Sequence, residues 1–410
     1  MKKIYSILKP DFYDKFSCKG SSCNYHCCRD WRIDLTKDEY HKWKKAGIFD
    51  KKDVDDIVSI NNSSHAYANI HLNEQNACPF LSEEHLCEIQ LKHGSKMLSQ
   101  VCRQFPRIVH GYCGKLEYAL SLGCEAVLEL LLNEKEGICL ETENIHFKPD
   151  LKLSTAYGIN TRTKSPSLKS YYDIQALFLM ILQAEGETME NKLILLGIAL
   201  RHIDELYANN KGDKASEYIE QFLSEVEHFS VLDIIGDIEY NDGTLIINNL
   251  LSLFSSTDKT NVGLTLIFDK IKDRIEWNET IDDKSGEHKI SLSLEKVPEY
   301  RKHFKEWSKD KEYFIENIMV AYMMYSNIPF KDNDLSLWNN FVYFVYVYCE
   351  MKTYLGILLD EESTDEDMIH YLTVFFRKLG HNKALFYTVI NDFKKEENSL
   401  AKLAILLYNS

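Results

Sequence analysis

The stretch Phe16-Ser17-Cys18-Lys19-Gly20-Ser21-Ser22-Cys23-Asn24-Tyr25-His26-Cys27-Cys28 decides how the first part of this chain folds. It places four cysteines within eleven positions, separated largely by residues such as glycine, serine and asparagine that favour a loop. Thiolates are preferred ligands of iron–sulfur clusters and of structural zinc. The stretch therefore predicts an irregular loop that wraps a metal, with Cys18, Cys23, Cys27 and Cys28 as ligands. Cys27 and Cys28 need not serve one site, because adjacent side chains of an extended segment point to opposite faces.

Four further cysteines follow at wider spacing and are also expected to bind metal: Cys78, Cys87, Cys102 and Cys124. Two short apolar runs, Cys78-Pro79-Phe80-Leu81 and Leu86-Cys87-Glu88-Ile89, flank a polar link at 82–85. This pattern predicts a hairpin that brings Cys78 near Cys87, with a helix beginning at Ser82 as the alternative. Arg103 and Arg107 lie beside Cys102 and could offset the negative charge of a thiolate-bound cluster.

The eight thiols allow one four-iron cluster with spare thiols, two clusters, or a cluster and a zinc site, and the sequence leaves these alternatives open. Buried free cysteines in a packed core are the alternative to metal binding. The remaining cysteines are isolated and are expected in the core: Cys113, Cys139 and Cys349. Four histidines are less expected as ligands: His26, His85, His93 and His110.

Cysteine placement also bears on the compartment, since all eleven cysteines except Cys349 lie at or before Cys139. The N-terminus lacks an apolar run long enough for an export signal, so we expect a cytoplasmic protein whose cysteines bind metal rather than form disulfides. The apolar segment Phe341 to Leu359 contains Glu350 and Lys352 and many tyrosines. It predicts a buried helix rather than a membrane span.

Size and charge set broader limits. A chain of 410 residues exceeds the usual size of a single core, and we expect a cysteine-rich module at 1–145 and a helical domain at 171–410, joined by the polar segment 146–170. The net charge of −15 argues against nucleic-acid binding, which needs a basic surface. An acidic surface keeps a protein soluble and could also favour a lysine-bearing partner.

The fold class expected is mainly α, with an irregular N-terminal module. Within that module we predict a strand around Ile33, a helix capped by Thr36 and Glu39 and ended by Gly47, a short helix from Ser95 to Pro106, and a helix opened by Cys124. Later helical periodicity is expected at 171–185, 188–209, 214–229, 261–277, 297–326, 336–356, 364–379 and 382–394. A strand near 244–247 or around 290–294 is expected to interrupt them.

The cysteine loop resembles the start of the flagellin lysine N-methylase family, which is part of the broader CxxCxxCC metal-chelating group, although the spacings here are longer. The resemblance continues through Cys78-Pro79-Phe80-Leu81, Cys102-Arg103-x-Phe105-Pro106-Arg107 and Ser121-Leu122-x-Cys124-Glu125. In the C-terminal half, Glu316-Asn317 ahead of Pro329-Phe330 and Phe376-Arg377 ahead of His381-Asn382 are similar to family segments.

The resemblance implies methyl transfer from S-adenosylmethionine to lysine ε-amino groups of flagellin, by a protein that carries a 4Fe–4S cluster, with zinc as the alternative metal. The sequence contains no glycine-rich dinucleotide-type loop, so a conventional methyltransferase fold is not expected. It assigns neither a catalytic residue nor a cofactor pocket, and it leaves the oligomeric state open.

Removal of the lysine proton needs either desolvation or a carboxylate or tyrosine base. Glu88, Glu125, Tyr118 and Tyr322 are possible but are not distinguished from packing residues. The spacing of Arg377, His381 and Asn382 would let them share a helical face, where a helix cap or a buried hydrogen-bond network is the favoured role and substrate binding the second. The rival function is a non-catalytic zinc- or iron-binding module that docks a protein partner.

Overall fold

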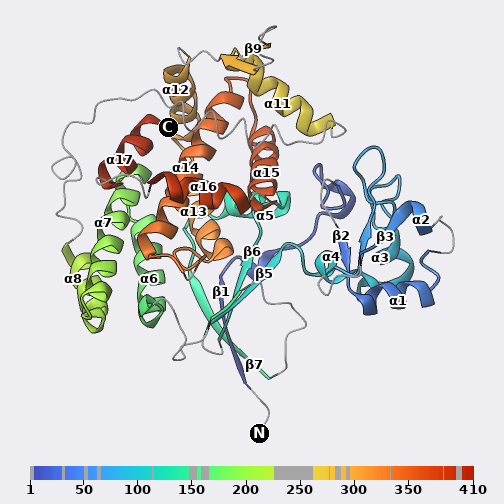
Figure 1. Cartoon of the computed structure of the whole chain (residues 1–410), viewed down its shortest axis with the longest axis horizontal. Coiled ribbons are helices and arrows are strands. Elements are labelled where there is room, and N and C mark those ends of the chain that lie inside the picture. The colour runs from blue at the N-terminus through green and yellow to red at the C-terminus, as the bar shows by residue number, and fades with distance from the viewer. Residues whose placement is uncertain are drawn as a thin grey trace.

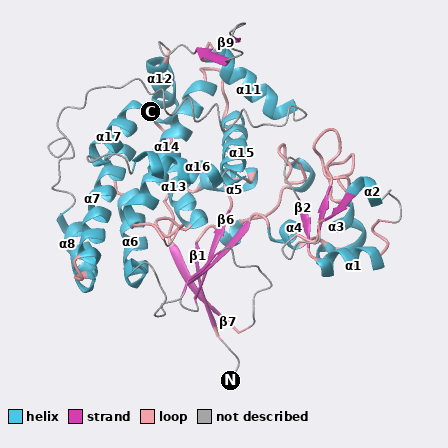
Figure 2. Cartoon of the chain, in the orientation of Figure 1, coloured by secondary structure: helices cyan, strands magenta, loops and turns pink. Residues whose placement is uncertain are grey.

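The computed structural model describes residues 4–29, 33–49, 54–61, 66–112, 115–146, 155–157, 166–225, 262–276, 278–281, 288–291, 296–332, 334–381, 383–393 and 399–410. These residues form a helical body, a sheet at its base and a small lobe at one side (Figure 1). Helices predominate throughout the body (Figure 2), which confirms the expected fold class.

A five-stranded sheet, which the sequence patterns do not predict, lies at the base of the body. Its order is β7 (Leu140–Ile145), β1 (Tyr5–Pro10), β6 (Lys115–Leu120), β5 (Arg107–Tyr112) and β8 (Thr155–Tyr157). β1 runs parallel to β6 with Ile7 opposite Leu116, whereas β5 and β6 are antiparallel with His110 opposite Glu117. The strands are short and come from distant segments, so their pairing is a tertiary event that local patterns indicate poorly.

Within the residues that the structure describes, the small lobe contains a three-stranded sheet and four short α-helices. The sheet has the order β2 (Ile33–Leu35), β4 (Ala68–Ile70) and β3 (Val58–Ile60). The helices are α1 (Lys37–Lys45), α2 (Val54–Ile57), α3 (Glu88–His93) and α4 (Gln100–Gln104). The predicted strand is confirmed, since Ile33 is buried within β2.

The predicted capping box of α1 is also confirmed. The Glu39 N–H donates to Thr36 Oγ1 at 3.3 Å, and the Thr36 N–H donates to Glu39 Oε2 at 2.8 Å. These two bonds satisfy backbone donors that a helix N-terminus leaves unpaired. Gly47 follows the helix with a φ of +69°, a conformation that glycine adopts without steric cost.

The segment of the predicted hairpin forms a tight turn. Leu81 pairs antiparallel with Cys87, and the Ser82 N–H donates to the Leu86 carbonyl at 2.9 Å. The alternative of a helix beginning at Ser82 is therefore wrong, and the helix begins instead at Glu88.

The predicted helix from Ser95 is divided in two. A 3-10 turn at Ser95–Met97 precedes α4, which is capped by the Ser99 hydroxyl. Farther along, Cys124 is the N-cap of α5 (Glu125–Asn133), as predicted.

The helical body agrees closely with the periodicity of the sequence. Its helices are α6 (Tyr171–Leu182), α7 (Met189–Ala208), α8 (Ala215–Glu225), α11 (Val262–Arg274), α12 (Val297–Ser308), α13 (Glu312–Ser326), α14 (Leu337–Leu358), α15 (Asp365–His381), α16 (Lys383–Phe393) and α17 (Ser399–Asn409). The single helix expected at 297–326 is wrong, because the chain breaks between α12 and α13. α17 was not predicted.

A two-stranded sheet, β9 (Asn278–Ile281) with β10 (His288–Ser291), agrees with the strand expected around Ile290. The alternative strand at 244–247 lies outside the described residues.

Helix α14 is the centre of the body. Nearly every side chain from Phe341 to Leu358 is buried, including the carboxylate of Glu350. The prediction of a buried, aromatic-rich helix is confirmed. Among the helices that the structure describes, none combines the length and the apolar composition that crossing a bilayer requires.

Two hydrophobic cores hold the described residues together. The smaller lies within the lobe and runs in sequence from Ile33 to Ile89. The larger combines the β1–β5–β6 sheet and α5 with the helices of the body, for example Ile7 and Leu128 with Phe344. Side chains on both sides of the expected boundary at 146–170 therefore contribute to the larger core.

Candidate metal centre

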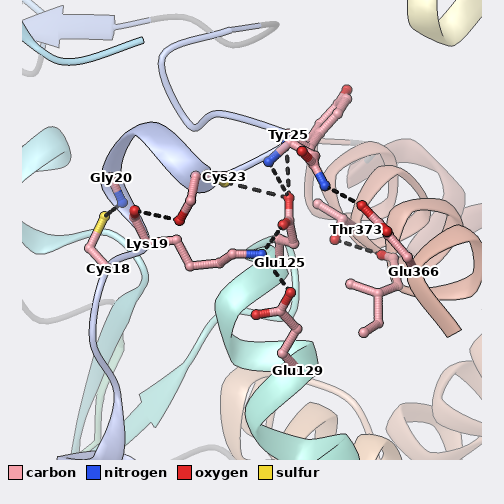
Figure 3. Close-up of polar contacts among 12 residues, drawn as sticks. Cys18, Lys19, Gly20, Cys23, Tyr25, Glu125, Glu129, Glu366 and Thr373 are labelled. Atoms are coloured by element: carbon pink, nitrogen blue, oxygen red, sulfur yellow. Dashed lines mark hydrogen bonds and ion pairs between the residues drawn. The ribbon is translucent and has the colours of Figure 1, made fainter. Parts of the chain in front are cut away.

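Glu125 fixes the backbone of the first cysteine loop (Figure 3). Glu125 is the first residue of α5, and its Oε2 accepts hydrogen bonds from the Asn24 and Tyr25 N–H groups at 2.9 Å each. Its Oε1 pairs with Lys19, which also contacts Glu129 at 2.5 Å. A single buried carboxylate thus orients the chain between Lys19 and Tyr25.

The contacts of Glu125 explain the shift of its pKa. Burial raises the pKa of Glu125, but the bonds from Lys19, the Tyr25 N–H and Cys23 outweigh burial and leave the pKa below its ordinary value. The carboxylate is therefore ionised and accepts these bonds as an anion. Burial, together with the charge of Glu125, raises the pKa of Cys23 to about 12.

Arg377 of α15 ties the same loop to the body. Its guanidinium donates to the Tyr25 carbonyl at 2.7 Å, the His26 carbonyl at 3.0 Å and the Gly123 carbonyl at 2.8 Å. It also lies over the Tyr25 ring, 4.1 Å from its centroid. The favoured role for Arg377, a hydrogen-bond network, is confirmed. Asn382 lies outside the described residues, as does the side chain of His381.

Five of the predicted thiols form one neighbourhood. The Cys78 N–H donates to the Cys28 carbonyl at 2.8 Å, and Cys28, Cys87 and Cys102 pack against the lobe core that contains Cys78. The thiol of Cys28 is also hydrogen-bonded to that of Cys27. The loop, the turn at 81–87 and helix α4 therefore meet at this point.

The hydrogen bond between the thiols of Cys27 and Cys28 moves their pKa values in opposite directions. The hydrogen bond from Cys28 lowers the pKa of Cys27 to about 7, and the Arg377 guanidinium also lowers it. The same bond raises the pKa of Cys28, with further contributions from burial and from Cys27, Cys78 and Cys87. Burial raises the pKa of Cys102 to about 12, and the neighbouring thiols add to this effect. Several thiolates cannot form here together unless a cation compensates their charge, which is what a bound metal does.

Two regions of the chain match known family models. Residues 175–406, more than half of the chain, match the C-terminal domain of the FliB lysine N-methylases. This chain belongs to the FliB lysine N-methylase family. Residues 17–124 match the CxxCxxCC model, a candidate zinc- or iron-chelating domain, and this span includes all eight predicted ligands.

Curated members related to this FliB-family chain come from Salmonella. The chain is 33% identical over 148 residues to a lysine-N-methylase of Salmonella typhimurium, which is 35% of this chain and 37% of that protein. It is 34% identical over 143 residues to the flagellar biosynthetic protein FliU of Salmonella muenchen, which is 34% of this chain and 84% of that protein. A lysine-N-methylase of Salmonella choleraesuis aligns over 37% of its own length, so the alignments span little more than a third of the lysine-N-methylases. No solved structure matches the chain.

The remaining predicted ligands of the FliB-family chain are Cys124, Cys23 and Cys18. Cys124 is close enough to Cys27 and Cys23 for their charges to affect one another's pKa values. Cys18 is exposed, and its sulfur accepts a hydrogen bond from the Gly20 N–H at 3.4 Å. Within the described residues, no three His, Cys, Asp or Glu side chains are arranged to hold a metal ion. The set of eight ligands therefore stays a prediction.

Two of the histidines considered as ligands contact each other. The rings of His26 and His85 are stacked, with centroids 4.7 Å apart, and so join the cysteine loop to the turn of the lobe. Burial, followed by the charges of His85 and Arg29, lowers the pKa of His26. His110 lies elsewhere, with its Nε2 3.0 Å from the Tyr325 carbonyl.

The three isolated cysteines, which were expected in the core, have different outcomes. Cys349 is buried, as expected, whereas Cys139 is exposed and the expectation of a core position is wrong. Cys139 comes directly before the edge strand β7, most of whose residues face solvent. Cys113 lies outside the described residues.

Of the possible bases, Glu88 is paired with Lys92 at the surface of α3.

Proposed function

We propose that this protein transfers methyl groups from S-adenosylmethionine to lysine ε-amino groups of flagellin. The observation that carries the proposal is the match to the FliB lysine N-methylase C-terminal domain over more than half of the chain. The name of the related flagellar protein supports a flagellar substrate. We further propose a cytoplasmic location, where newly made flagellin is available.

We also propose that the N-terminal thiols bind a 4Fe–4S cluster. The donor set fits a thiophilic metal, because Cys28, Cys87 and Cys102 pack against the lobe core that contains the buried Cys78, and Cys27 adjoins Cys28. These residues would hold the metal, with Cys18, Cys23 and Cys124 completing the set of eight. A cysteine side chain needs rotation about only one torsion to reach its neighbours. A bound cluster would supply either redox chemistry, an open iron site or a structural link.

The transfer itself is a substitution at carbon. S-adenosylmethionine, when bound, supplies a methyl group on a positively charged sulfur. The lysine nitrogen forms the new N–C bond with its lone pair as the S–C bond breaks, so the ammonium proton must leave first. The protein's part is to hold the two groups in line, to exclude water and to accept that proton.

The proposal is tested by incubating the purified protein with S-adenosylmethionine and unmethylated flagellin, followed by mass spectrometry of flagellin lysines. The expected result is lysine masses increased by whole methyl units. A flagellin unchanged in the presence of intact, metal-loaded protein would refute the assignment. The same measurement on flagellin from cells with and without this protein tests the substrate in its natural setting.

The metal proposal has its own test. Protein purified without oxygen should be brown, contain iron and sulfide, and bleach in air. Single Ser substitutions of Cys27, Cys28 and Cys102 should each lower the iron content, whereas Cys139→Ser should not, because Cys139 is exposed beside an edge strand. A colourless protein with stoichiometric zinc would favour the non-catalytic alternative, and equal iron loss in all four variants would refute the ligand assignment.

A further inference from the structure

A cavity of about 430 Å³ lies in the helical body, away from the cysteines that we assign to metal. Strand β5 and helices α13, α14, α15 and α16 supply its walls, together with the segment that follows α13. A volume of this size is within the range of pockets that bind small organic ligands.

The walls of this aromatic cavity are mainly rings. Tyr322 and Tyr325 come from α13, Tyr343 from α14, Phe376 from α15 and Phe386 from α16. The faces of aromatic rings attract an organic cation, and the same rings stack on a heterocycle. Such a lining suits a ligand that carries both a positive charge and a flat ring system.

Charged groups of both signs line the cavity. Lys331 is exposed and lies 5.8 Å from the ring centroids of both Tyr343 and Phe386. Next to it, the Asp332 carboxylate accepts a hydrogen bond at 3.0 Å from the hydroxyl of Tyr387, a half-exposed residue. An ammonium and a carboxylate side by side suit a ligand that carries a carboxylate as well as hydroxyl or amino groups.

The interior of the cavity does not add positive charge. Burial lowers the pKa of His110 to about 4, so its ring is neutral at physiological pH. Its Nε2 lies 3.0 Å from the Tyr325 carbonyl, on the wall formed by β5 and α13. A cation can therefore enter among the rings without repulsion from this histidine.

We propose that the aromatic cavity binds an adenosyl sulfonium, the chemical class to which S-adenosylmethionine belongs. The inference rests on the proposed function and names the pocket for its methyl donor. The rings match the sulfonium and the adenine, Lys331 matches the carboxylate, and Asp332 matches the ribose hydroxyls or the amino group. A lysine side chain alone would leave most of the cavity empty.

One helix connects this cavity to the candidate metal centre. Phe376 and Gly380 line the cavity from α15, and Arg377 on the same helix holds the cysteine loop through the carbonyls of Tyr25 and His26. The cavity and the thiols are thus joined by a rigid element rather than by a mobile linker.

Gly380 offers a test that does not depend on removing a packed side chain. It is exposed, and a Cβ built on it would lie 3.3 Å from the hydroxyl oxygen of Tyr325. Gly380→Leu would therefore project into the aromatic cavity, while a larger residue on the last turn of a helix need not destabilise the fold. Ala208→Leu, an exposed position at the end of α7 that does not line the cavity, is the matched control.

The measurement is equilibrium binding of S-adenosylmethionine and, separately, of S-adenosylhomocysteine, which lacks the sulfonium charge but keeps the carboxylate, to the full-length, metal-loaded protein. Gly380→Leu should weaken binding of both ligands roughly tenfold or more through steric overlap. Lys331→Gln should weaken binding about tenfold by removing the charged partner of the carboxylate. Ala208→Leu should bind as the unsubstituted protein does, and iron content and far-ultraviolet circular dichroism should be unchanged in all three variants.

Unaltered binding by a folded Gly380→Leu protein would overturn the pocket assignment, as would unsubstituted protein that binds neither ligand. The outcome for the proposed function is separate. If the protein methylates flagellin and the Gly380→Leu variant binds the donor normally, the proposed function stands and only the pocket assignment is refuted. If these substitutions abolish donor binding but the unsubstituted protein methylates no lysine, the pocket assignment stands and the proposed function is refuted.

Discussion

Replacement of Glu350 by glutamine should stabilise the protein, and increasingly so as the pH rises. Glu350 is completely buried in α14, and its nearest hydrogen-bond partner is the Tyr346 hydroxyl, 3.4 Å from one oxygen. Its other oxygen has no hydrogen-bond partner among the described residues. Burial raises the pKa of Glu350 to about 8, against an ordinary value of 4.5.

The magnitude follows from that difference. Because the folded state holds the proton more tightly, the folded protein binds more protons than the unfolded chain between the two pKa values, and stability falls as the pH rises through this window. At pH 9 the cost approaches about 5 kcal/mol, and at pH 6 it is about 2 kcal/mol. Glutamine does not ionise, so Glu350→Gln should gain roughly 3 kcal/mol more at pH 9 than at pH 6.

The assay is reversible urea unfolding followed by circular dichroism at pH 6 and pH 9, with the free energy of unfolding compared between the variant and the unsubstituted protein. Glu190→Gln is a matched control of opposite sign. Glu190 accepts bonds from Lys352 at 2.6 Å and Tyr348 at 2.9 Å, and the charge of Lys352 outweighs burial so that the pKa of Glu190 is lowered. Its substitution should destabilise at both pH values. A Glu350→Gln difference that does not grow with pH would refute the argument from burial.

Three further changes test other parts of the structure. The lowered pKa of His110 means that, as the pH falls from 7 to 4, the unfolded chain binds the extra proton first, which lowers the free energy of unfolding by about 3 kcal/mol. His110→Asn should not show this decrease. Parallel pH profiles for the variant and the unsubstituted protein would count against the argument. Arg377→Lys keeps the charge but carries its N–H donors on a single nitrogen, which cannot reach the three carbonyls that Nε, Nη1 and Nη2 of the guanidinium contact. It should therefore cost roughly 3 kcal/mol and lower iron retention on gel filtration. Unchanged retention would separate Arg377 from the metal centre. Glu125→Gln should speed amide hydrogen exchange at residues 24 and 25 severalfold, because a neutral amide oxygen is a weaker acceptor for both N–H groups than the carboxylate. Unchanged exchange would show that other contacts hold the loop.

Local chemistry in the sequence determined much of this protein. The capping box at Thr36 and Glu39, the helix that follows Cys124 and the buried helix around Phe341–Leu358 depend on neighbours within a few turns, and the structure has them where the sequence predicts. The crowding of cysteines before residue 140 likewise indicates a metal-chelating module, and the match of residues 17–124 to the CxxCxxCC domain agrees with it.

Tertiary structure decided what distant segments do together. The five-stranded sheet pairs Tyr5–Pro10 with Lys115–Leu120 and Leu140–Ile145, and no local pattern specifies partners so far apart in the chain. The role of Arg377 depends on carbonyls about 250 and 350 residues earlier, and the aromatic cavity exists only where five elements meet. The periodicity of a segment indicates which of its faces is apolar. Packing across the whole body determines which apolar faces contact one another.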